Sequence, residues 1–70
     1  MSSDERDKLR ALLSYWVEHN QEHSQEFKEW ADKAKALGET EVADEMLQAV
    51  QAMDKASGLL SQSLKRLEEA

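Results

Sequence analysis

A seven-residue repeat of apolar side chains runs through most of the chain and limits its fold more than any other feature. In the first half the repeat occupies positions 9, 13, 16, 20, 23, 27, 30, 34 and 37. In the second half it occupies positions 43, 46, 50, 53, 57, 60, 64 and 67. Alternating steps of three and four residues place side chains on one face of an α-helix and are typical of coiled-coil packing. The repeat therefore predicts two long amphipathic helices.

The two repeats are separated at Leu37-Gly38, where glycine can adopt the left-handed conformation that ends a helix. Thr40 suits the N-cap of the next helix, and Ser2 with Glu5 matches a capping box at the start of the chain. We expect a helix over about 3–37, a turn over 38–40 and a helix over about 41–69. So short a turn makes the helices antiparallel, and the predicted fold is an all-α two-helix hairpin forming one domain over residues 1–70.

The turn also predicts which residues face each other, because residues whose numbers add to about 80 lie at the same level of such a hairpin. Further apolar residues flank both repeats, and a single hairpin would leave both tryptophans half exposed. A stripe this wide favours more than one packing partner. We therefore expect a homodimer in which two hairpins form a four-helix bundle. Its predicted packing residues are Leu13, Trp16, Phe27, Trp30, Met46, Val50, Met53, Leu60 and Leu64.

Two polar residues, Asn20 and His23, interrupt the apolar repeat of the first helix. The predicted register places them opposite a small and polar patch of the second helix. A polar residue in a coiled-coil seam often fixes the register and the oligomeric state, and a buried histidine usually finds a hydrogen-bond partner. One interpretation is therefore a structural polar layer, composed of Asn20, His23, Ser57 and Ser61.

The alternative interpretation is a metal site. His19, His23 and Glu26 have spacings of four and three residues, which place all three on one helix face. Two neutral imidazoles at this spacing can share one ion, and a carboxylate can supply a third ligand for Zn²⁺ or Ni²⁺. No Lys or Arg lies between Arg10 and Lys28, and a cation would relieve the repulsion among the glutamates of that segment. No cofactor is strictly required by the sequence, and both interpretations remain open.

Catalysis is not expected. His19 to His23 formally match the H-x-x-E-H pattern of inverted zinc proteases, but the intervening Glu22 falls at an outer position of the heptad. Two helices also offer no substrate cleft, and there is no cysteine, phosphate loop or nucleophile–base pair. We therefore predict a protein that is not an enzyme.

Charge and hydropathy restrict the partners. The formal net charge is −6 and no basic block occurs, so nucleic-acid binding is not expected. No apolar run approaches the ~20 residues of a membrane span, and the first residues lack the apolar stretch of a signal peptide. The expectation is a cytoplasmic protein with no membrane partner.

The motif Trp16-x-x-His19-Asn20-x-x-His23, followed by Phe27-x-x-Trp30-Ala31 and the Leu37-Gly38 turn, resembles a group of short helical-hairpin proteins of bacteria and archaea, many of them anaerobes. That family is uncharacterised, so the resemblance implies the hairpin with its central histidines and no particular activity. The leading hypothesis is a small protein that acts by association with itself or with a partner protein helix. The second is divalent metal binding through His19, His23 and Glu26.

Overall fold

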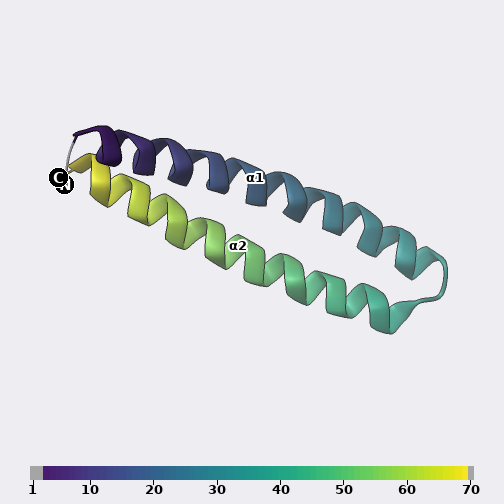
Figure 1. Cartoon of the computed structure of the whole chain (residues 1–70). Coiled ribbons are helices and arrows are strands. Elements are labelled where there is room, and N and C mark those ends of the chain that lie inside the picture. Colours follow the sequence, from purple (N-terminus) through teal and green to yellow (C-terminus); the bar gives the residue numbers. More distant parts are fainter. Residues whose placement is uncertain (1–2, 70) are drawn as a thin grey trace.

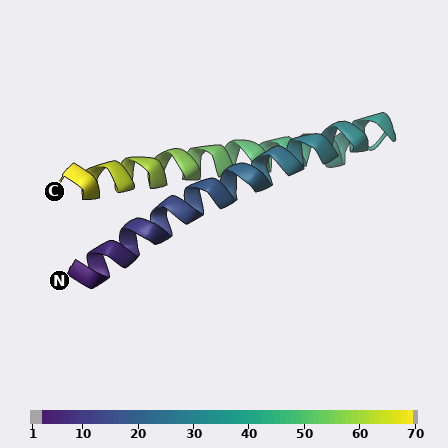
Figure 2. The same cartoon turned by 90° about the horizontal axis from the view of Figure 1, so that it is seen from above.

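The computed structural model describes residues 3–69 and consists of two antiparallel helices. Helix α1 spans Ser3–Ala36 and helix α2 spans Thr40–Glu69, and they lie side by side along their length (Figure 1). The chain measures 53 × 14 × 13 Å, and a view from above shows the helices crossing at a shallow angle (Figure 2). The predicted all-α hairpin is confirmed. Ser2, and with it part of the expected capping box, lies outside the described residues.

The end of α1 forms the structure expected at Gly38. This glycine has φ of 88°, in the left-handed region, and its amide donates to the carbonyl of Lys35 at 3.0 Å. The amide of Glu39 donates to the carbonyl of Ala34 at 2.9 Å. These two bonds define a Schellman motif, which satisfies carbonyls that the helix leaves unpaired. The glycine therefore allows the chain to reverse within three residues.

Helix α2 begins one residue earlier than expected. The carbonyl of Glu39 accepts the bond from the amide of Ala43 at 3.0 Å, so Glu39 occupies the cap position that we expected for Thr40. Glu41 lies in the first turn of α2, and Lys33 and Lys35 lie in the last turn of α1. These charges oppose the partial charges of the helix ends and stabilise the turn modestly.

The seam of α2 follows the predicted heptad at every position. Ala43, Val50 and Ser57 are buried. The residues between and beyond them in the repeat are half-buried, namely Met46, Met53, Leu60, Leu64 and Leu67. All other described residues of α2 are exposed. The apolar period of this helix was therefore sufficient to identify its packing face.

The seam of α1 differs from the prediction in one of its two rows. Leu13, Asn20, Phe27 and Ala34 are inside the seam, as expected. Their neighbours in the seam form the row Val17, Ser24 and Ala31, whereas the predicted row was Leu9, Trp16, His23, Trp30 and Leu37. Ala31 is only 1% exposed, while Trp30 is 54% and Trp16 40% exposed. The row of the two tryptophans is therefore not the one that packs on α2, and both stay partly exposed, as expected of a single hairpin.

The reason is geometric. Both rows flank the row of Leu13, and either one gives alternating steps of three and four residues. Serine and alanine let two helices approach more closely than tryptophan does, and the small row is the one that packs on α2. The core is accordingly thin: it consists of Leu13, Ala31, Ala43 and Val50, and no large side chain of the described residues is fully buried. A core this small contributes limited stability on its own.

The two glycines give opposite expectations for substitution. A Cβ at Gly58 would meet open space inside a helix, so Gly58→Ala should raise the free energy of unfolding by about 0.5–1 kcal/mol. A Cβ at Gly38 would also meet no atom, but its positive φ is strained for alanine. Gly38→Ala should therefore lower that free energy by about 1–2 kcal/mol. Urea denaturation of both variants at one protein concentration measures the two effects. A loss of stability in Gly58→Ala would contradict the open position.

Candidate functional site

The polar contact between the helices lies at Ser24. Its side chain is 3% exposed, and its hydroxyl donates to Asp54 Oδ1 at 2.7 Å. Lys28 Nζ lies 3.9 Å from Asp54 Oδ2. The numbers of residues 24 and 54 add to slightly less than 80, and those of residues 28 and 54 to slightly more. Both pairs therefore agree with the register expected from the turn. Neither Ser24 nor Asp54 was singled out from the sequence, although the opposite charges of Lys28 and Asp54 at matching levels were an available signal.

The predicted polar layer forms only in part. Asn20 and His23 are half-buried, Ser57 is buried, and Ser61 is exposed. Within the part of the chain that the structure describes, the Ser57 hydroxyl has no hydrogen-bond partner. The prediction that Ser61 belongs to a core layer is therefore wrong. Because the small row of α1 occupies the seam, His23 lies on its flank, and the hydrogen bond across the helices is made by Ser24.

The unpaired flank of α1 carries a second heptad repeat. We call it the outer face, and it contains Leu9, Leu12, Trp16, His19, His23, Glu26, Trp30, Lys33 and Leu37. Its apolar members are at least one-third exposed, and Leu37 reaches 79%. The Lys33 ammonium lies 4.2 Å from the centre of the Trp30 ring. Apart from Lys33, the outer face is therefore apolar towards both ends and polar at its centre, where the three predicted metal ligands lie.

A column of rings fixes the two histidines. Tyr15 and His19 stack with centroids 5.4 Å apart, His19 and His23 meet edge to face at 4.4 Å, and Phe27 lies 5.9 Å beyond His23. The Nε2 atoms of the two imidazoles are 3.0 Å apart. The structure thus brings together two of the three predicted ligands, whose Nε2 atoms face each other at hydrogen-bond distance.

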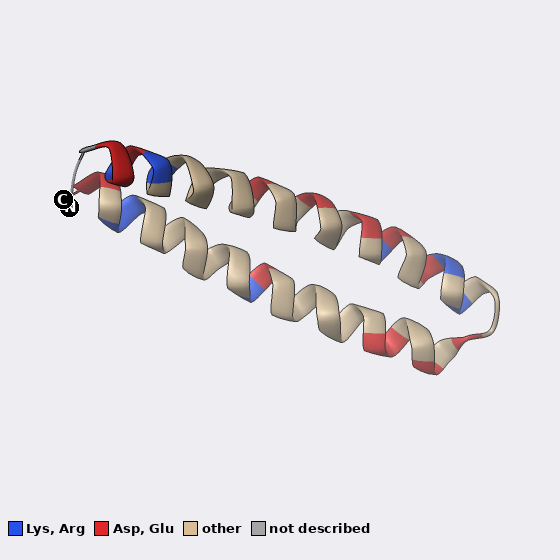
Figure 3. Ribbon diagram, viewed as in Figure 1, with Lys and Arg blue, Asp and Glu red and all other residues tan. Residues whose placement is uncertain are grey.

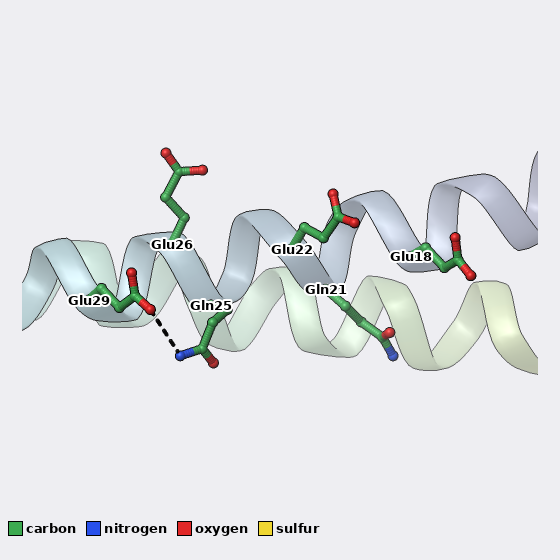
Figure 4. A pocket seen from close by; sticks show the side chains of 6 residues that line it. All are labelled: Glu18, Gln21, Glu22, Gln25, Glu26 and Glu29. Atoms are coloured by element: carbon green, nitrogen blue, oxygen red, sulfur yellow. Dashed lines mark hydrogen bonds between the residues drawn. The ribbon is translucent and has the colours of Figure 1, made fainter.

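Glu26 does not join them within one chain. Among the described residues, no three histidine or carboxylate side chains are close enough to bind one ion. Figure 4 shows the carboxylate of Glu26 on the side of α1 away from α2. A three-ligand site of His19, His23 and Glu26 is therefore not assembled by the hairpin alone.

An acidic surface borders the outer face. Glu18, Glu22, Glu26 and Glu29 line a shallow, open depression together with Gln21 and Gln25 (Figure 4). Figure 3 shows acidic positions along α1 from its middle to the turn. Glu22 is exposed on this surface. Neither described helix has a stretch long and apolar enough to cross a membrane.

A family model describes most of this chain. The domain of unknown function DUF8180 matches residues 9–67. The chain belongs to the DUF8180 family. The matched span includes the seams of both helices and the whole outer face. No curated protein and no solved structure matches the chain significantly.

The hydrogen bond of Ser24 has a measurable stability effect. Ser24→Ala removes the bond to Asp54 and should lower the free energy of unfolding by about 1 kcal/mol relative to Ser14→Ala. Ser14 is exposed on the same helix, so it corrects for the higher helix propensity of alanine. Chemical denaturation of both variants provides the comparison. Equal stabilities would show that the Ser24–Asp54 bond does not stabilise the seam.

Proposed function

We propose that this protein acts by self-association and not by catalysis: two copies pair through their outer faces, with the two α1 helices antiparallel. The observation that carries the proposal is the division of α1 into two rows. The small row packs on α2, while the row of Leu9, Trp16, His23, Trp30 and Leu37 is left on the flank with its large apolar members exposed. Exposed apolar surface of this extent marks an interaction site.

A second copy suits this row because the row reads the same in both directions. Its order is Leu, Trp, His, Trp, Leu at intervals of seven residues. An interface between two identical copies must be complementary to itself. Antiparallel pairing centred on His23 places Leu9 against Leu37 and Trp16 against Trp30 of the partner subunit. A partner helix of unrelated sequence would require an apolar stripe but no such symmetry.

The second row of the outer face is compatible with the same pairing. Leu12 then lies near Lys33 of the partner subunit, and His19 near its Glu26. No like charges meet in either pair. The adjoining flank of α2 carries the small residues Ala49 and Ala56, which are exposed and leave room for the partner's tryptophans. The resulting assembly is a bundle of four helices, as expected from the width of the apolar stripe.

Molecular mass tests the association. Sedimentation equilibrium should give twice the chain mass of 8.0 kDa. Trp16→Ala and Trp30→Ala should each weaken the dimer by about 2 kcal/mol, or roughly 30-fold in Kd, because buried tryptophans dominate interface energies. Leu59→Ala is the matched control, since Leu59 is equally exposed but lies on α2 outside this face. A monomer of 8.0 kDa at high concentration would contradict self-association and assign the face to another protein.

Cross-linking tests the antiparallel arrangement. The chain contains no cysteine, so single-cysteine variants report one position each. His23→Cys lies at the centre of the proposed pairing and should form an intermolecular disulfide rapidly under mild oxidation. Glu22→Cys lies at the same level but on the exposed acidic surface, so it should react far more slowly. Equal rates in the two variants would contradict the arrangement, even if the protein is dimeric.

A further inference from the structure

Resting on the proposed dimer, we infer that the outer face holds two symmetry-related sites for a divalent transition metal ion. Each site consists of Nε2 of His19, Nε2 of His23 and the carboxylate of Glu26 of the partner subunit. The histidines thus come from one chain and the carboxylate from the other. Each ion retains open positions for water.

The histidine pair has the spacing of a chelate. If an ion formed bonds of about 2.05 Å to two nitrogens 3.0 Å apart, the nitrogen–metal–nitrogen angle would be about 95°. That angle suits the octahedral or square geometry of Ni²⁺, and an opening of about 0.3 Å gives the tetrahedral angle that Zn²⁺ prefers. Tyr15 stacks on His19, and Phe27 lies beside His23. Binding replaces the hydrogen bond between the two Nε2 atoms, and the rings must turn so that both Nε2 lone pairs point at the ion.

The third ligand follows from the pairing of the helices. Within its own chain Glu26 lies beyond His23 and does not reach the histidine pair. In antiparallel pairing centred on His23, Glu26 of the partner subunit lies at the level of Asn20, between His19 and His23. The carboxylate that the single chain fails to supply is thus placed beside the two imidazoles by the second chain. The two sites lie about 6 Å apart along the helices, since their centres differ by four residues.

The surrounding charge favours a cation. From Ala11 to Phe27 the chain has no Lys or Arg, while Glu18 and Glu22 lie on the adjoining acidic surface. Negative charge at this density raises the local concentration of divalent cations. It would also oppose the approach of two acidic chains, and bound cations reduce that repulsion. Imidazole with carboxylate, and no thiolate, is a donor set for Zn²⁺ or Ni²⁺ rather than for soft ions.

Calorimetric titration of the metal-free protein with Zn²⁺ or Ni²⁺ tests the site. We expect one ion per chain and a melting temperature that rises with metal and returns with EDTA. His19→Ala and His23→Ala should abolish binding, and Glu26→Gln should weaken it by at least about tenfold. Glu22→Gln is the matched control, because Glu22 lies between the histidines in sequence but on the acidic surface. This variant should bind the metal ion with the same affinity as the unaltered protein. Equal affinity in Glu26→Gln would overturn the shared site.

Mixing two defective chains gives a sharper test. One chain carries Glu26→Gln and the other carries His19→Ala with His23→Ala. Each homodimer lacks a complete site, but a mixed dimer has one. Tight metal binding should therefore reappear after the two variants are unfolded and refolded together. No recovery would overturn the inference. The outcome is distinct from failure of the dimer itself: a dimer of twice 8.0 kDa without metal binding rejects the site alone, whereas a monomer of 8.0 kDa rejects the association as well.

Discussion

The close contact between the small row of α1 and the seam of α2 determines the rest of this structure. Ser24 and Ala31 allow the helices to approach, and the hydrogen bond from Ser24 to Asp54 fixes their register from within the seam. Because a helix has two rows beside any central row, seating the small row on α2 necessarily turns the other row outward. The exposure of Trp16 and Trp30 is thus a consequence of the packing and not a separate feature of the chain.

The sequence predicted the turn and α2 well, and α1 only in part. Gly38 marked the reversal because its position after the last apolar residue matched a helix C-terminus, and every seam position of α2 followed from its period. In α1 the bulky row was chosen for its hydrophobicity. Hydrophobicity alone does not identify the row that packs on α2 when a helix carries two rows suited to packing. It shows which row is more apolar, but not which partner each row contacts. The complementary charges of Lys28 and Asp54, which the sequence analysis did not use, were a signal for the correct row.

The candidate site shows the same limit. The spacing of His19 and His23 was enough to predict that their rings would meet, since residues four apart on a helix are neighbours. Placing Glu26 with them treated the helix as if it were alone. A residue three positions further on lies on the same face, but its carboxylate is not among the groups near the imidazoles. Ligands that come from a second chain depend on the pairing of helices, which a period within one chain does not contain.

The polar centre of the outer face has a structural consequence even without a metal ion. Leucine and tryptophan repeat every seven residues, so a paired α1 could in principle slide by one heptad and still bury apolar surface. Such a shift would place His23 against a tryptophan and separate the histidine pair from Glu26 of the partner subunit, and burying polar groups against an apolar ring is costly in an interface. The proposed pairing centred on His23 would keep the histidines and Glu26 together. Register control and metal binding are therefore not competing explanations of these residues, because both require the same polar groups at the centre of the same apolar row.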